Sequence, residues 1–321
     1  MITYILFGTG IILLIKGADY LVDGSSSLAK KFKVPTIVIG LTIVAFGTSM
    51  PELVVNIASA IRNSGDIAFG NIVGSNIVNI LLILGISGII GSLKVQSSTV
   101  WKEIPFSLLA VIVLVVFANA HVLDKLNFNS ILKFEGIVLV LFFIIFLYYV
   151  FGLARKNKLK LDDKKIEIKK YSGGIIFLMI IGGLIALYFG GKWTVDGAIL
   201  IARAFGLSEY FIGLTIVAVG TSLPELVTSI VAAIKKQNDL AVGNIVGSNI
   251  FNIFWILGLT AIINPIVIPV SANIDLLVLL VATVLLFVFM FLGKRHELDR
   301  WQGIMFVIMY VVYVVYLTGR G

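Results

Sequence analysis

Long apolar runs that recur along the whole chain limit its possible folds more than any other feature. Each run is about 20 residues long, the length that an α-helix needs to cross a bilayer. Only 13% of the 321 residues are charged, against about 25% in an average soluble domain. We therefore predict an all-α membrane protein with ten transmembrane helices, at roughly 2–28, 36–61, 67–91, 102–120, 132–153, 173–203, 210–234, 240–264, 273–292 and 301–318.

This pattern excludes a soluble enzyme and a disordered chain, and the absence of cysteine excludes a disulfide scaffold. It also argues against an outer-membrane barrel, whose strands give short alternating segments. The first run occupies the place of a signal peptide. Asp19 and Asp23 stand where a cleavage site would be expected and no basic segment precedes the run, so we interpret it as a span.

Basic residues are divided very unequally between alternate loops. One set of loops holds 18 Lys and Arg residues and the other set holds five. The positive-inside rule makes the first set cytoplasmic, which places both termini outside and the segment 154–172 inside the cell. We interpret the basic stretch Arg155–Lys170 as a solvated cytoplasmic connection, with a lipid-headgroup or regulatory role as the alternative. The net charge of +8 thus reflects orientation in the bilayer of a cell membrane and predicts no nucleic-acid partner.

An internal repeat divides the chain into two halves. Residues 40–80 and 213–253 align without a gap and are identical at 28 of 41 positions, at a constant offset of 173. Each half then contains five predicted spans, and because five is odd the second half enters the membrane from the opposite side. We predict two inverted five-helix repeats, residues 1–153 and 173–321, an architecture typical of secondary transporters. A channel built by gene duplication is the alternative.

Two acidic residues, Glu52 and its repeat mate Glu225, lie near the middle of predicted spans. An ionisable group at this depth costs a few kcal/mol, and it indicates a functional site unless a basic residue pairs with it. The basic residues within spans are Lys16 and Lys192, which lie one turn before Asp19 and Asp196 and are expected to pair there or to lie at the level of the lipid headgroups. The two glutamates therefore need a cation from elsewhere.

Each glutamate follows a proline in the motif GTS[ML]PE. Proline removes a backbone donor and predicts a kink in the helix, which would free carbonyl oxygens one turn earlier. These carbonyls belong to Ala45, Thr48, Ala218 and Thr221. The neighbouring hydroxyl groups of Thr48, Ser49, Thr221 and Ser222 share helix faces with the glutamates.

A second motif, GNIVGSNI[VF]NI, places more polar groups at the same depth. Short links make the two motif helices of each half antiparallel neighbours, so Asn79 and Asn252 reach the level of the glutamates, at about 1.5 Å of rise per residue. These two asparagines are candidate ligands or interhelical hydrogen-bonding groups. For Asn71, Asn76, Asn244 and Asn249 we favour the interhelical interpretation.

The predicted site offers only oxygen ligands, from carboxylates, carboxamides, hydroxyls and carbonyls. The chain has no cysteine, and His121 and His296 lie at span ends. Oxygen ligands suit hard cations such as Ca²⁺ and Na⁺, suit Mg²⁺ less well, and disfavour zinc and copper.

The paired GTS[ML]PE and GSNI[VF]N motifs resemble the α-repeats of the cation/calcium antiporter superfamily, in particular its prokaryotic sodium/calcium exchangers, and the resemblance covers essentially the whole chain. It implies that Glu52 and Glu225 bind Ca²⁺ and that Thr48 and Thr221 contribute carbonyls. It further implies that Asn79 and Asn252 complete the central position, and that Na⁺ is ligated with help from Ala45, Ser49, Ser75, Ala218, Ser222 and Ser248.

The resemblance implies electrogenic exchange of Na⁺ for Ca²⁺ by a chain that is not an enzyme, with no cofactor and no obligate protein partner. Asn252 departs from several family members, which have aspartate there, and this makes K⁺ dependence less expected. A proton/calcium exchanger that uses the same glutamates and a cation channel are the alternatives. An intramembrane enzyme is disfavoured because no Ser–His or Asp–Asp pair stands at matching depth.

Overall fold

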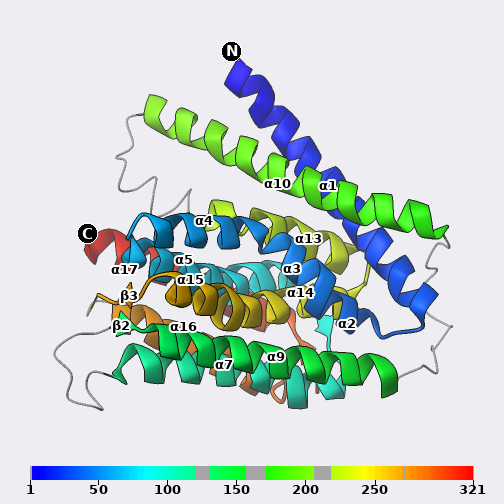
Figure 1. The fold of residues 1–321 in the computed structure, drawn as a ribbon. Coiled ribbons are helices and arrows are strands. Elements are labelled where there is room, and N and C mark those ends of the chain that lie inside the picture. Colours follow the sequence, from blue (N-terminus) through cyan, green and yellow to red (C-terminus); the bar gives the residue numbers. More distant parts are fainter. Residues whose placement is uncertain (1, 121–129, 157–170, 206–217, 270–271, 321) are drawn as a thin grey trace.

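The computed structural model describes residues 2–120, 130–156, 171–205, 218–269 and 272–320, and this part of the chain is almost entirely helical (Figure 1). The first half contains the α-helices α1 (Ile2–Phe32), α2 (Thr36–Ile39), α3 (Ala45–Thr48), α4 (Met50–Ile61), α5 (Gly65–Ile77), α6 (Gly85–Ile90), α7 (Ile104–Ala118) and α9 (Lys133–Lys156). Three segments are π-helical: η1 (Gly40–Val44), η2 (Val78–Leu84) and η3 (Thr99–Glu103). Two short strands are β1 (Leu93–Lys94) and β2 (Ser130–Ile131).

Part of the second half repeats the order of elements found in the first half. Its helices are α10 (Gly173–Ala204), α12 (Ala218–Thr221), α13 (Leu223–Ile234), α14 (Asn238–Ile250), the π-helix η5 (Phe251–Leu257), α15 (Gly258–Ile263), α16 (Ala272–Phe289) and α17 (Arg300–Arg320), with strands β3 (Ile266–Val267) and β4 (Glu297–Leu298). From α4 to β1 and from α13 to β3, every paired element has the same length and the same offset of 173 residues. The sequence repeat is thus also a structural repeat.

Eight helices of the described residues are long and apolar enough to cross a membrane, and a ninth span is formed if the bent pair Thr36–Thr48 and Met50–Ile61 is counted as one. The all-α membrane fold is therefore confirmed. The predicted seventh span, 210–234, begins in residues outside the described part, and the described α13 covers its last 12 residues. The count of ten stays a prediction.

The predicted kink at GTS[ML]PE is present in both halves. The two parts of the bent pair meet at an angle of 47°, and Ser49 lies at the junction with φ −81° and ψ 9°. Ser222 has nearly the same backbone angles, φ −89° and ψ 9°. Pro51 and Pro224 fall in the first turn of the following helices, where a missing backbone donor costs nothing. Each glutamate consequently lies in the first turn of a new helix.

The two longest helices, α1 and α10, pack against each other along one side of the molecule (Figure 1). Glycines make their close crossing possible. A Cβ added at Gly17 would lie 2.9 Å from the carbonyl oxygen of Gly183, and one added at Gly183 would lie 2.8 Å from that of Gly17. Gly10 and Gly190 show the same reciprocal contact at 2.9 Å. These four positions are two pairs of repeat mates, Gly10 with Gly183 and Gly17 with Gly190, so the two contacts are equivalent under the sequence repeat.

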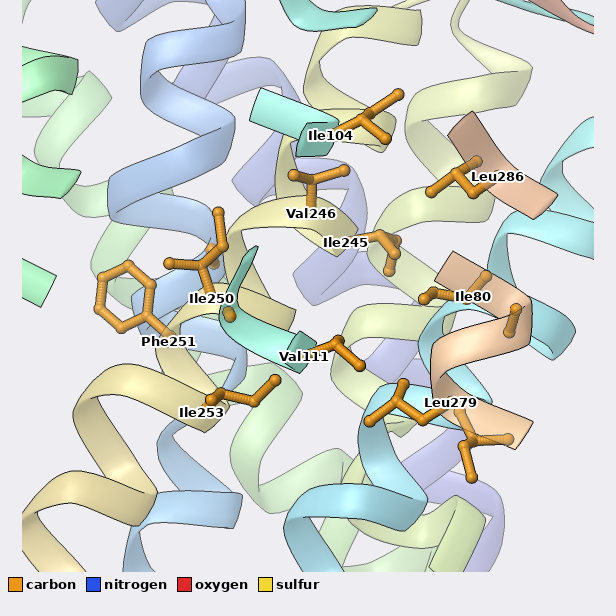
Figure 2. Close-up of a cluster of buried hydrophobic side chains, with 14 of the residues drawn as sticks. Ile80, Ile104, Val111, Ile245, Val246, Ile250, Phe251, Ile253, Leu279 and Leu286 are labelled. Atoms are coloured by element: carbon orange, nitrogen blue, oxygen red, sulfur yellow. The ribbon is translucent and has the colours of Figure 1, made fainter. Parts of the chain in front are cut away.

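The largest hydrophobic core lies on the other side of the motif helices. Figure 2 shows part of it: Ile80 of η2, Val111 of α7, Ile245 of α14 and Leu279 of α16 converge from four separate helices. All four side chains are fully buried. This core holds the motif helices of both halves together from below, while α1 and α10 cover them from above in the view of Figure 1.

Two small antiparallel strand pairs join the halves crosswise. Strand β1 pairs with β4, with Leu93 opposite Leu298, and β2 pairs with β3, with Ile131 opposite Ile266. The strand after α6 therefore lies beside the strand before α17, and the strand after α15 lies beside the strand before α9.

Candidate ion site

Glu52 and Glu225 lie at the centre of the site, each in the first turn of the helix that follows a break. Each is only 1% exposed. A carboxylate in this position is favoured by the partial positive charge at the helix N-terminus. Their burial nevertheless requires further stabilising partners, because an uncompensated buried charge is costly.

Serine hydroxyls from the opposite half provide part of this stabilisation. The Ser49 hydroxyl donates to Glu225 Oε1 at 3.0 Å, and the Ser222 hydroxyl donates to Glu52 Oε1 at 3.2 Å. Ser75 also donates to Glu52 Oε1, at 3.4 Å. The two broken helices are therefore cross-linked at their breaks, and the glutamates of both halves belong to one site.

Asn79 and Asn252 also reach across between the halves. The Nδ2 group of Asn79 donates to Asn249 Oδ1 at 2.9 Å, and that of Asn252 donates to Asn76 Oδ1 at 3.0 Å. Each amide nitrogen is thus satisfied by an asparagine of the other repeat. The two π-helical segments η2 and η5 carry Asn79 and Asn252, and no sequence pattern predicted this helix type, which is common at functional sites.

Buried oxygen atoms without a hydrogen-bond partner remain at the site. They are Oε2 of Glu52, Oε2 of Glu225, Oδ1 of Asn79, Oδ1 of Asn252 and Oγ of Ser248. Four of the five form two pairs of repeat mates. Buried polar atoms are nearly always satisfied in proteins, so this set of acceptors lacks a positive or hydrogen-bonding partner that the protein itself does not supply.

The hydroxyl groups of the two motif threonines form hydrogen bonds to other protein groups. Thr48 Oγ1 donates within its own helix to the Val44 carbonyl at 3.0 Å and contacts Asn244 Oδ1 at 3.0 Å. Thr221 Oγ1 contacts Asn71 Oδ1 at 3.4 Å. The hydroxyls thus bind the neighbouring motif helices, and only the backbone carbonyls of the threonines remain as candidate ligands.

The kink was predicted to free the Ala45 carbonyl from its helical hydrogen bond, but this bond is kept in the structure. This oxygen accepts the backbone N–H of Ser49 at 3.0 Å, because the helical hydrogen bond persists up to the junction itself. The Thr48 hydroxyl also lies 3.4 Å from this oxygen, so the two lone pairs of the Ala45 carbonyl are both directed at groups of its own helix. Ala218 begins α12, but its side chain lies outside the described part.

The interhelical role predicted for four asparagines agrees with their contacts. Asn76, Asn249 and Asn71 accept the hydrogen bonds given above, and Asn244 donates to Ser229 Oγ at 3.0 Å. Asn56 was not among the predicted residues, and its Nδ2 group donates to the Glu52 carbonyl at 2.9 Å. Asn56 and Ser229 are repeat mates, four residues after the glutamates, and this spacing was the signal that could have revealed them.

Within the described residues, no basic side chain pairs with either glutamate. Ion pairs elsewhere in the described residues include Lys235 with Asp19 and Asp23, and Lys294 with Glu297. The expected pairing of Lys16 with Asp19 on one helix is therefore wrong: Asp19 is paired with Lys235 of the other half, whose Nζ lies 2.6 Å from Asp19 Oδ1.

The fold and the site together define an all-α, multi-pass membrane protein with a buried oxygen-rich site between its two repeats. The sequence profile described as "Sodium/calcium exchanger protein" matches residues 2–152 and 175–319. The chain belongs to this sodium/calcium exchanger protein family. The solved structures of the sodium-calcium exchanger NCX_Mj are similar over 98% of this chain and 98% of that one, with a TM-score of 0.82 and 33% identity.

Two relatives are also similar over nearly their full length. The chain is 32% identical to the sodium/calcium exchanger MaX1 of Methanosarcina acetivorans, over 98% of both chains. It is 37% identical to the putative antiporter CaxA of Alkalimonas amylolytica, over 95% of both chains. Family membership makes this chain a transporter of the exchanger type.

Proposed function

We propose that the protein is a secondary active antiporter that exchanges Na⁺ for Ca²⁺ across the cell membrane by alternating access. The unpartnered buried oxygens of Glu52, Glu225, Asn79 and Asn252 carry this proposal. Two carboxylates and two carboxamides with no basic partner among the described residues form an acceptor set that suits a hard cation.

The charge of the site explains why two different ions can alternate in it. Two carboxylates give a formal charge of −2, which one Ca²⁺ or two Na⁺ would neutralise, and a third Na⁺ would leave +1. Without bound ions, two negative charges at the membrane midplane disfavour the closed state that a switch of access requires. Ca²⁺ and Na⁺ therefore compete for the same groups. Ca²⁺ occupies the site during one change of access and Na⁺ occupies it during the return.

The remaining ligands follow from the contacts and from the family resemblance. Thr48 and Thr221 offer backbone carbonyls beside the glutamates. Na⁺ would use groups around the centre, namely Ala45, Ser49, Ser75, Ala218, Ser222 and Ser248. Ser248 is fully buried and its hydroxyl lies beside the carboxylate of Glu225, which supports this assignment. The transported ions are the substrates, and the proposal needs no cofactor.

Ten spans in two inverted repeats, residues 1–153 and 173–321, with the connection 154–172 between them, form the proposed architecture. The strand pairs support this count. Strands β1 and β4 lie on the same side only if an even number of spans separates them, and the same holds for β2 and β3. With ten spans, six spans separate β1 from β4 and four spans separate β2 from β3. Without the seventh span, these numbers would be five and three, which are both odd.

The orientation rests on the basic residues of the loops. We propose that the side of β1 and β4 is cytoplasmic, together with the segment 154–172, and that both termini and the side of β2 and β3 face outside.

Calcium uptake into proteoliposomes tests the function directly. ⁴⁵Ca²⁺ uptake should depend on an outward Na⁺ gradient, and it should generate a current where three Na⁺ exchange for one Ca²⁺. Uptake driven by a proton gradient and indifferent to Na⁺ would replace the proposal by proton/calcium exchange through the same glutamates. Uptake that needs no counter-ion on the opposite side would indicate a channel.

A further inference from the structure

Two helix contacts that the sequence repeat relates to each other differ in the structure. The repeat relates α1 to α10 and α13 to α4, so the contact of α1 with α13 corresponds to the contact of α10 with α4. The first contact is extensively packed: Leu14, Ala18 and Leu21 of α1 are buried, with Leu223, Val227 and Val231 of α13 against the same cluster. A cavity of about 190 Å³ lies at the second contact.

An ion-pair cluster closes the packed end. Lys235, directly after α13, places its Nζ atom 2.6 Å from Asp19 Oδ1 and 2.6 Å from Asp23 Oδ1 on α1. The same ammonium donates to the Asp19 carbonyl at 3.2 Å. Partial burial by itself would lower the pKa of Lys235, but the hydrogen bonds and charges of the two aspartates outweigh this and raise the pKa. Lys235 is therefore charged and held to α1 by three acceptors.

The corresponding groups at the other end are apart. The repeat mate of Lys235 is Arg62 and that of Asp23 is Asp196. Asp196 lines the cavity together with Val54, Val195 and Thr221. In the part of the chain that the structure describes, neither Arg62 nor Asp196 takes part in an ion pair.

We propose that Lys235 with Asp19 and Asp23 is a latch that holds α1 against α13, and that Arg62 with Asp196 is its counterpart, which closes when the first latch opens. The proposal rests on the proposed alternating-access function and names the residues that hold one of its two states. In the orientation given above, the closed latch lies on the cytoplasmic side and the open cavity faces outside.

The two latches are unequal, and this inequality has a consequence. The repeat mate of Asp19 is Lys192, so the second latch has one acidic partner for Arg62 where the first has two for Lys235. Lys192 also lines the cavity and opposes the approach of a second cation. The state with the latch of Lys235 closed is therefore favoured at rest, and Lys235 contributes to that bias.

The absence of native cysteine allows the two states to be read without measuring transport. Val54→Cys reports on the cavity, and its repeat mate Val227→Cys reports on the packed α1–α13 contact. Both are labelled with a membrane-impermeant maleimide in the purified protein at a fixed Na⁺ concentration. Lys235→Gln should raise the ratio of labelling rates, Val227→Cys over Val54→Cys, by about three- to fivefold, the scale of a partly exposed ion pair.

Lys236→Gln is the matched control, because it removes the same charge from the neighbouring residue, which makes no ion pair in the described structure. It should leave the ratio unchanged. Asp23→Asn should act like Lys235→Gln, and Lys235→Asp combined with Asp23→Lys should restore the ratio, which a purely structural lysine would not do. Monodisperse elution confirms that each variant is folded.

The outcomes separate this proposal from the proposed function. If Lys235→Gln and Asp23→Asn both label as the wild type while Na⁺-driven Ca²⁺ uptake is present, the latch is overturned and the function stands. If the labelling ratio shifts as expected but no Na⁺-driven uptake exists, the two states are real and the function is wrong.

Discussion

The Ser49 hydroxyl of one repeat donates to Glu225 Oε1 of the other at 3.0 Å, and the reverse pair, Ser222 to Glu52 Oε1, lies at 3.2 Å. These bonds join the two broken helices at the point where each begins again. They fix one oxygen of each carboxylate and leave Oε2 of both glutamates without a partner. The same relationship thus joins the repeats and leaves one acceptor of each carboxylate for the proposed ion between them.

Replacing either glutamate by glutamine should abolish Ca²⁺ transport and leave the fold intact. Glu52→Gln or Glu225→Gln removes half of the formal negative charge of the site, and we expect a loss of about 3 kcal/mol in ion binding, or about 100-fold. The measurement is Na⁺-driven ⁴⁵Ca²⁺ uptake by purified protein in liposomes.

Glu103→Gln is the control for this pair. Glu103 is also fully buried, but it accepts a hydrogen bond from Tyr149 in another part of the core. The glutamine keeps an acceptor there, so uptake should persist. Normal uptake by either Glu52→Gln or Glu225→Gln would contradict the assigned site.

The wild-type protein should exchange without K⁺. Asn252 is neutral and mated with Asn79, so the site has the charge of two carboxylates. Asn252→Asp adds a third carboxylate and replaces the group that donates to Asn76 Oδ1 at 3.0 Å. This variant should hold monovalent ions more tightly and show a steeper pH dependence, because a carboxylate beside two others is protonated more readily unless a cation offsets it.

The measurement for Asn252 is Na⁺-driven Ca²⁺ flux over a range of K⁺ concentration and pH. Asn71→Asp serves as the control, since Asn71 contacts Thr221 and was assigned an interhelical role. A K⁺ requirement in the wild type, or an Asn252→Asp variant that behaves as the wild type throughout, would show that Asn252 does not contact the ion.

Accessibility of the strand loops should follow their pairing. In intact cells, cysteines at Ser130 and Val267, which are partners in the pair of β2 and β3, should react with an impermeant reagent. Cysteines at Lys94 and Glu297, partners in the other pair, should react only in inverted vesicles. If the two members of one pair react from opposite sides, the ten-span topology fails. If both pairs react from the reverse sides, only the orientation is wrong.

Side-chain bulk at the α1–α10 crossing should be destabilising. Gly183→Val would place its Cβ 2.8 Å from the Gly17 carbonyl oxygen, and overpacking of this kind costs about 1–3 kcal/mol. We expect a lower Tm in a thermal-unfolding assay and reduced transport. Gly182→Val, one residue earlier with nothing within 4 Å of an added Cβ, should unfold as the wild type does.

The sequence by itself determined the class of fold and the identity of the central residues. Apolar runs of bilayer length require helices, since the backbone must satisfy its own hydrogen bonds in lipid. The repeat with its paired GTS[ML]PE motif pointed to Glu52 and Glu225 as the candidate ligands, because unpaired charges at that depth are costly and the proline dictates a break. These conclusions depend on local chemistry and on position along the chain, which a sequence displays.

Only the tertiary structure decided which oxygens remain free and which residues meet across the repeats. Whether Asn79 presents its carbonyl oxygen depends on Asn249, 170 residues away, which accepts its amide hydrogen. Thr48, by contrast, uses its hydroxyl on its own helix and on Asn244. Asp19 pairs with Lys235 and not with Lys16, because helix packing brings Lys235 to 2.6 Å. Such choices depend on distances between segments far apart in the chain, and spacing along one helix does not contain them.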